Sequence, residues 1–317
     1  MTAGPFFDLI QSLGDLQSTR YAELASSCII VYDHLITLDR EIDLIWMSPW
    51  STGKVLFILN RYYTLTSVLI NNYGLFGSHL TNSICSHFYP WQGWTGLIAC
   101  ILAEAILQMR IYALYYLNKR LLVVMVTLFV ACMASSAYVM GSVLSNIDAI
   151  AVNFSGWHVC LPLNVSSHFY AFWIPILFFE TFLCILAIYR GFQTFKTDGS
   201  LFQSGRRLVG ILIRDSVMYF IVMCATYLTN LLVWVLARQT LLEIPIGFSV
   251  AFSCVLANRV VLNVRHINRE NSTEHRRVSR IRIESNHTRD AVYRVQANSR
   301  LNEIEMACLR SLRAPNV

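Results

Sequence analysis

Two acidic side chains stand inside long apolar stretches, where charge needs a physical reason. Glu104 falls midway along one stretch, and Gln108 lies one helical turn further on the same face. Glu180 lies in another stretch, five residues after Pro175, which is expected to kink a helix. A carboxylate at mid-membrane depth can bind a cationic ligand or relay a proton. The alternative is a neutral carboxylic acid that is hydrogen-bonded to a neighbouring helix and has a structural role.

A second candidate arrangement brings opposite charges together. Asp33 lies six residues before Asp39, where its apolar stretch ends, and Arg61 lies seven residues after Lys54, where the next stretch begins. At ~1.5 Å per helical residue, both side chains would lie roughly 9–10 Å below the same membrane surface. We expect Asp33 and Arg61 to face each other and to pair, joining the first two helices. Otherwise Arg61 extends to the surface and Asp33 lines a hydrated crevice.

The elements that carry these residues are predicted by composition. The chain is 55% hydrophobic and only 14% charged, whereas an ordinary globular domain is roughly 25% charged. The 42 residues between Arg61 and Glu104 contain no Asp, Glu, Lys or Arg. Such runs exceed the ~20 residues with which a helix crosses a bilayer. The sequence therefore predicts an all-α integral membrane protein built as a seven-transmembrane helix bundle. The expected spans are about 18–38, 55–76, 92–116, 121–144, 168–189, 209–236 and 242–264.

The distribution of Lys and Arg predicts the orientation of these spans. The first, third and fifth connections hold the basic residues, whereas the second, fourth and sixth hold only Arg238. By the positive-inside rule, the N-terminus is outside and the tail is cytoplasmic. Two glycosylation sequons, at Asn153 and Asn164, fall in the fourth connection, on the outer side. If the first stretch were only interfacial, the protein would have six spans and both termini on one side.

Of nine cysteines, only Cys85 and Cys160 fall in predicted outer loops, the second and the fourth. The outer side faces an oxidising compartment, so a disulfide is allowed there and disfavoured elsewhere. We expect a bridge between Cys85 and Cys160 that covers the outer mouth of the bundle. The alternative is two free thiols that lie too far apart to bond.

Residues 21–62 also carry a distinctive pattern of aromatic and polar residues. The pattern consists of Tyr32-Asp33-His34, Thr37-Leu38, Glu41, Ile45-Trp46, Trp50, Lys54-Val55-Leu56-Phe57 and Asn60-Arg61-Tyr62. It resembles the N-terminal signature of a family of multi-pass membrane proteins from mushroom-forming fungi, defined only as a domain of unknown function. Two later segments, Arg110–Tyr115 and Asn258–Arg265, fit the same family. The resemblance implies a membrane architecture and no activity.

Three regions are expected along the chain. Residues 1–17 form an outer N-terminus that lacks the basic start of a cleavable signal peptide. The membrane domain, 18–265, is followed by an Arg-rich cytoplasmic tail, 266–317, whose composition predicts disorder. The arginines are expected to hold the tail to anionic lipids of the inner leaflet, not to nucleic acid. Ser279 and Ser285 stand beside arginines and are phosphorylation candidates, which would weaken this adhesion.

Several chemistries find no support in the sequence. It contains no phosphate-binding Gly-rich loop and no nucleophile elbow, and its histidine spacings match no zinc pattern. We therefore expect no enzyme, no metal and no cofactor. The expected topology matches that of G-protein-coupled receptors, although their sequence motifs are absent. The expected function is that of a receptor or sensor in the plasma membrane or an endomembrane, which could signal to a cytoplasmic partner. The alternatives are a proton-coupled carrier and a non-signalling membrane scaffold.

Overall fold

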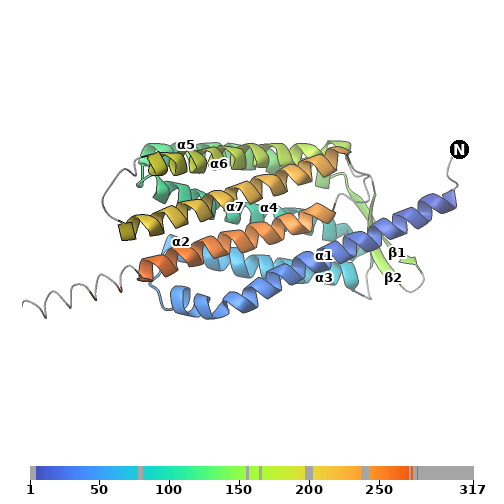
Figure 1. Cartoon of the computed structure of the whole chain (residues 1–317). Coiled ribbons are helices and arrows are strands. Elements are labelled where there is room, and N and C mark those ends of the chain that lie inside the picture. The colour runs from blue at the N-terminus through green and yellow to red at the C-terminus, as the bar shows by residue number, and fades with distance from the viewer. Residues whose placement is uncertain are drawn as a thin grey trace, which may run out of the picture. The chain divides into compact units, whose positions relative to one another are not determined.

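The computed structural model of the chain describes residues 5–77, 81–154, 157–163, 166–196, 203–236, 243–270, 273 and 277. The chain divides into two compact units, Met1–Val264 and Arg265–Val317. The first unit contains long helices that run side by side, with a short β-hairpin at one end (Figure 1). The candidate residues of the membrane domain lie within this first unit.

The helices of the first unit follow one another up and down, as elements joined by short connections do. Their bounds are α1 Pro5–Glu41, η1 Ile42–Trp46, α2 Thr52–Ile58, η2 Leu59–Tyr63, α3 Thr64–Phe76, α4 Asn82–Leu114, α5 Lys119–Leu144, η3 Ser167–Phe172, α6 Trp173–Lys196 and α7 Gln203–Leu236. A further helix, Ile244–Glu270, begins in the first unit, and we call it the last helix. η1 and η2 are π-helices, and η3 is a 3₁₀ helix. η1 continues the C-terminal end of α1, whereas η2 joins α2 to α3 within one helical run. π-helices inside helices are frequent at functional sites.

Five helices of the described part are long and apolar enough to cross a bilayer. They are Asn82–Leu114, Lys119–Leu144, His168–Gln193, Val217–Leu236 and Ile244–Glu270. These helices support an all-α, multi-pass membrane protein and coincide with the last five predicted spans. The first two predicted spans, 18–38 and 55–76, are also helical but are not among the five. The first of them lies in α1, which contains several charged residues, and the second is divided among α2, η2 and α3.

Polar residues in the connections fix where several helices begin. The Ser51 side chain accepts a hydrogen bond from the Lys54 backbone N–H at the start of α2. Thr81 accepts one from the Ile84 N–H at the start of α4, and Asn118 caps α5 in the same way. Such caps satisfy donors that have no partner within the helix. The cap on α4 fixes the position along the bundle of the residues that α4 carries.

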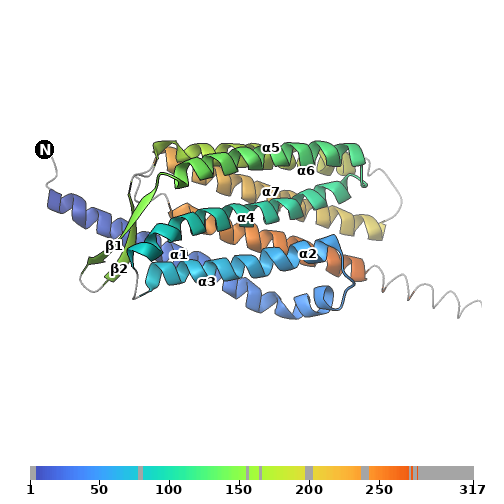
Figure 2. The same ribbon diagram turned by 180° about the vertical axis from the view of Figure 1, so that it is seen from behind.

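The core of the bundle lies among α4, α5, α6, α7 and the last helix. Large buried side chains such as Leu107, Met125, Phe179 and Tyr227 form one continuous cluster. The view from behind shows α4 between α5 and α3 (Figure 2), and α4 packs against α3, α5 and α6. Exposed apolar residues, including Val130, cover the outer face of α5, as expected of a helix that faces lipid. Glu104, which α4 carries into this core, is therefore far from solvent.

A two-stranded hairpin is a correction to the all-α expectation. β1, Asp148–Phe154, pairs antiparallel with β2, Trp157–Leu163, and Ala151 lies opposite Cys160. Aromatic and β-branched residues flank Ser155-Gly156, a dipeptide whose sequence is typical of turns, and this pattern is a hairpin signal. The hairpin packs on α4 and α3 at one end of the bundle.

Candidate functional site

Two glutamates from different helices meet inside the bundle. Glu104 lies on α4 and Glu180 on α6, and both residues are 0% exposed. Because α4 and α6 pack against each other, the two carboxyl groups are close enough to interact electrostatically. Gln108, one helical turn after Glu104, is also buried. The structure therefore brings together the two mid-helix acids that the sequence presented as separate candidates. We call them the carboxyl pair.

The carboxyl pair lacks the partners that buried acids usually have. Among the described residues, no N–H or O–H group outside the pair donates a hydrogen bond to any of the four carboxyl oxygens, which can bond only to each other. Ionised carboxylates only accept hydrogen bonds, so the two groups can bond to each other only if at least one carries a proton. Two ionised carboxylates would repel each other in this low-dielectric interior. The pair therefore requires a shared proton or a bound cation.

A cavity of about 110 Å³ lies beside the carboxyl pair, toward the β-hairpin, and we call it the outer cavity. Its wall is mostly apolar, and the aromatic residues that line it are Tyr89, Phe169, Phe172, Trp173 and Trp234. The polar residues that line it are Gln92, Glu243 and Ser249. An apolar cleft or cavity with a few convergent polar groups is the usual form of a small-molecule site.

The outer cavity and the carboxyl pair are neighbours along α4. Cys100 lines the cavity and lies one helical turn before Glu104. Trp173 also lines the cavity, and its ring lies 6.2 Å from that of Tyr227, measured between centroids. The Tyr227 hydroxyl shares a 3.2 Å hydrogen bond with that of Ser253 on the last helix. A molecule in the outer cavity would therefore touch side chains that adjoin the carboxyl pair.

Asp33 and Arg61 belong to a cluster of four charged residues with Glu41 and Arg259, which we call the ionic cluster. Arg61 Nε lies 2.7 Å from Glu41 Oε2, and Arg259 Nε lies 2.7 Å from Asp33 Oδ1. The pair expected from the sequence is the longest of the three contacts, at 4.0 Å between Arg61 Nη1 and Asp33 Oδ2. Each residue of that pair therefore has a closer partner. Two acids and two bases leave the ionic cluster without net charge.

Hydrogen bonds from the π-helices fix the ionic cluster. Glu41 Oε1 accepts from the Tyr62 hydroxyl at 2.8 Å and from Trp46 Nε1 at 3.0 Å. Arg61 Nη2 donates to the His34 carbonyl at 2.9 Å. Trp46 lies in η1, and Arg61 and Tyr62 lie in η2. The ionic cluster joins α1, η2 and the last helix with its charges compensated, which is the arrangement of a structural site.

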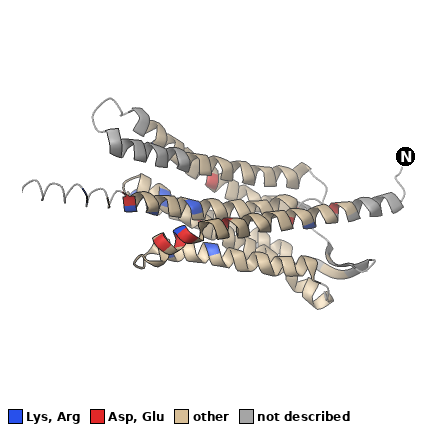
Figure 3. Cartoon of the chain, turned by 60° about the horizontal axis from the view of Figure 1, so that its bottom comes forward, with Lys and Arg blue, Asp and Glu red and all other residues tan. Residues whose placement is uncertain are grey.

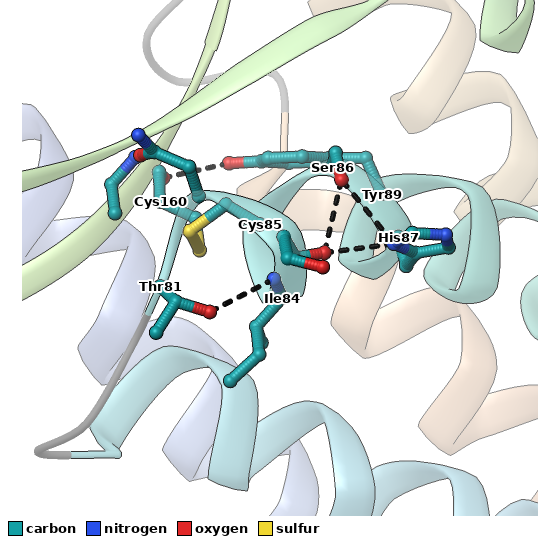
Figure 4. Close-up of a disulfide and its surroundings, with 10 residues drawn as sticks. Thr81, Ile84, Cys85, Ser86, His87, Tyr89 and Cys160 are labelled. Atoms are coloured by element: carbon teal, nitrogen blue, oxygen red, sulfur yellow. Dashed lines mark hydrogen bonds between the residues drawn. A yellow bond between two sulfur atoms is a disulfide. The ribbon is translucent and has the colours of Figure 1, made fainter.

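Cys85 near the start of α4 and Cys160 in β2 are joined by a disulfide, with Cα atoms 5.3 Å apart (Figure 4). The Tyr89 hydroxyl donates to the Cys160 carbonyl at 2.9 Å, and the Ala151 N–H donates to Asn82 Oδ1 at 2.8 Å. Tyr89 is also part of the wall of the outer cavity. The hairpin is therefore linked to α4 by a disulfide and by hydrogen bonds, one of which comes from a residue of the cavity wall.

The remaining candidates from the sequence are isolated or lie elsewhere. Asn153 lies in β1, whereas Asn164, Ser279 and Ser285 lie outside the described residues. Within the ranges that the structure describes, no group of three or more His, Cys, Asp or Glu side chains is placed to hold a metal ion. Charge spacing did not identify Glu41 or Arg259 as charge partners. Both stand in segments that carry the family resemblance, which was the available signal.

Similarity to known proteins is found in the N-terminal part of the bundle. The search of curated proteins finds no match to the chain. A family match covers the segment that supplies Asp33, Glu41 and Arg61 to the ionic cluster and contains both π-helices. Over residues 21–66, the chain is similar to the family described as "Family of unknown function (DUF6533)".

Proposed function

We propose that this protein is a seven-span membrane receptor or sensor whose ligand is a small apolar molecule bound in the outer cavity. The observation that carries this proposal is the mostly apolar cavity of about 110 Å³ inside the bundle. An apolar cavity of ~150 Å³ can bind benzene, so the outer cavity suits a ligand of few heavy atoms. Gln92, Glu243 and Ser249 would orient any polar group that such a ligand carries.

The seven proposed spans include α1 and the run from α2 to α3. Both lie along the bundle (Figures 1 and 2), and α1 packs against α3. The acids of α1 that interrupt its apolar sequence, such as Glu23 and Asp33, are buried, whereas Leu35 and Ile36 are exposed. The surface that this part of α1 would present to lipid is therefore apolar, although the helix as a whole contains charge.

The proposed orientation places the β-hairpin outside. Figure 3 shows charged residues gathered toward the end of the bundle that lies away from the N label. The positive-inside rule favours a cytoplasmic location for that end. The disulfide lies near the opposite end, where an oxidising outer compartment would preserve it. β1, which contains Asn153, would then lie on the side of the membrane where glycosylation takes place.

In this proposal, α4 carries the signal from the outer cavity toward the cytoplasm. Its residue Cys100 contacts the ligand site, and Glu104 belongs to the carboxyl pair. Nearer its other end, Arg110 Nη1 donates to the Val260 carbonyl of the last helix at 3.4 Å. A shift of α4 would therefore alter contacts at both ends. We propose that a cytoplasmic partner detects this change and that the Arg-rich tail binds anionic lipid.

The ligand proposal can be tested with benzene as the probe and the full chain in nanodiscs. Benzene should raise the melting temperature of the wild type, because it binds only the folded state. Val143→Phe, which fills the cavity, should abolish the rise. The matched control is Val130→Phe on the exposed face of the same helix, which should keep it. Equal responses in all three proteins, or none in the wild type, would contradict the ligand site.

A second candidate function, a proton-coupled carrier, is favoured by the carboxyl pair. Two buried carboxyls without donors can exchange a proton for a cationic substrate. In proteoliposomes, a carrier would show flux that depends on a pH gradient and is lost in Glu180→Gln. A receptor would instead show ligand-dependent recruitment of a cytoplasmic protein. If Glu104→Gln altered neither flux nor recruitment, a scaffold would be the better description.

A further inference from the structure

A second, smaller cavity of about 30 Å³ lies among α1, α3, α4 and the last helix, and we call it the polar cavity. Its polar lining consists of Glu23, Ser26, Thr64, Ser67, Asn71 and Thr95, together with Gln92. Gln92 and Gly96 also line the outer cavity, so the two cavities share part of a wall. A volume of this size accommodates a single water molecule or a single ion.

The hydroxyl groups in the polar cavity present lone pairs to it. Ser26 Oγ donates its hydrogen to the Glu23 carbonyl at 2.9 Å, and Thr95 Oγ1 donates to the Trp91 carbonyl at 2.8 Å. Because each hydroxyl has only one hydrogen, the remaining capacity of both oxygens is that of an acceptor. The cavity therefore favours an occupant that attracts oxygen lone pairs.

Two further oxygens lack donors. Thr64 is 0% exposed, and its hydroxyl interacts with the Cys254 sulfur, but among the described residues no N–H or O–H group donates to its Oγ1. Asn71 Oδ1 is a buried atom in the same situation. A buried polar atom without a partner is costly, and an ion or water in the polar cavity would remove that cost for both residues.

The negative charge of the polar cavity comes from Glu23. This residue is 7% exposed, and no lysine or arginine of the described ranges pairs with it. Arg20, one turn earlier on α1, holds its guanidinium over the Phe76 ring, 4.6 Å from the centroid. Gly247 lets the last helix approach, since a Cβ there would lie 2.9 Å from Glu23 Oε1. The carboxyl group is therefore held against the last helix, and Glu243 lies within electrostatic range of it.

We propose that the polar cavity is a binding site for a small monovalent cation, with sodium as the expected ion. Carboxylate, hydroxyl and amide oxygens are the ligands that hard cations prefer. A single carboxylate in the cavity balances one positive charge, whereas calcium sites usually supply several carboxylates. Soft and transition metals are disfavoured because the cavity contains no thiol and no imidazole. The site is independent of the ligand proposed for the outer cavity.

The test uses the full chain in nanodiscs, with sodium chloride exchanged for choline chloride at constant ionic strength. Sodium should raise the wild-type melting temperature in a saturable way, by about 2–4 °C. Choline, which is too large for the cavity, should not. Glu23→Gln should remove the saturable response. No difference between sodium and choline in the wild type, or an equal effect of calcium at far lower concentration, would overturn the assignment.

Two neighbouring serines provide a matched control if Glu23→Gln fails to fold. Ser26 and Ser27 both donate to the Glu23 carbonyl, but only Ser26 lines the polar cavity. Ser26→Ala should raise the sodium concentration at half-response by about tenfold, a loss of one ligand worth about 1.4 kcal/mol. Ser27→Ala should leave that concentration unchanged, whatever it does to stability. The same shift in both variants would mean that sodium acts through packing and not through this site. Because the outer cavity keeps its lining in either variant, benzene binding tests the proposed receptor function separately.

Discussion

The carboxyl pair and the ionic cluster both bury acids in the same bundle, but basic partners compensate the acids only in the ionic cluster. In the ionic cluster, Glu41 and Asp33 each have an arginine nitrogen at 2.7 Å, and Glu41 accepts two further hydrogen bonds. In the carboxyl pair, no described residue outside the pair donates to Glu104 or Glu180. Compensated charge holds helices together, whereas uncompensated charge is available to bind a proton or an ion. The presence of basic or hydrogen-bonding partners, more than the degree of burial, therefore distinguishes a structural acid from a candidate functional acid.

The largest expected effect comes from removing the central base of the ionic cluster. Arg61→Met would leave the buried Glu41 carboxylate without its closest partner and weaken the compensation of Asp33. Breaking a buried ion pair costs about 3–5 kcal/mol, so we expect a large fall in melting temperature and in the yield of monodisperse protein. The double variant Glu41→Gln/Arg61→Met should recover part of the loss. A cost below about 1 kcal/mol for the single variant would contradict the structural role assigned to the ionic cluster.

At the carboxyl pair, we expect removal of a charge to have the opposite effect on the free energy of unfolding. Glu104→Gln preserves the side-chain volume, removes a charge that has no partner and supplies an amide donor for Glu180. We expect unfolding free energy that is unchanged or higher by up to about 2 kcal/mol. The control is Gln108→Glu, which adds an acid one turn away on α4 and should destabilise the protein. If Glu104→Gln lowered stability as much as Arg61→Met does, the two regions would not differ in how they compensate buried charge.

The smallest expected effect tests the edge of the ionic cluster. The Arg259 side chain is 45% exposed, whereas that of Arg61 is 2% exposed. Water screens an exposed partner, so Arg259→Gln should cost about 0.5–1 kcal/mol, as measured by thermal or denaturant unfolding. Asp33 would keep its 4.0 Å contact with Arg61. A cost equal to that of Arg61→Met would show that the four residues act as one indivisible unit.

The helices and the two central acids could be predicted from the sequence, because charge-free runs and isolated charges inside them are local features. Glu104 and Glu180 were both found in this way, although nothing in their spacing showed that they would meet. The relation between Asp33 and Arg61 was harder to predict. Residue spacing along a helix gives depth in the membrane, but it does not give the direction in which a side chain points.

The end of the predicted span and the π-helix η2 both contribute to the difficulty of predicting the partners of Arg61. The first predicted span ends at residue 38, whereas α1 continues to Glu41 and then into η1. Arg61 lies inside η2, where a π-turn adds a residue and changes the direction of the side chains, so regular helical spacing could not place Arg61 beside Glu41. Arg259 lies on a helix far away in sequence, and the two cavities are defined by side-chain packing. None of these features has a local signal that could be read from spacing.

The disulfide between Cys85 and Cys160 also imposes an order on biosynthesis. Its two residues are 75 positions apart, and α5 lies between them. The bond can form only after α5 and the hairpin have been synthesised, yet it does not need α6, which carries Glu180. Since chains are made from the N-terminus, α4 can be locked to the hairpin before its partner glutamate leaves the ribosome. The carboxyl pair would then be assembled late, against α4, whose outer end the disulfide already holds in place.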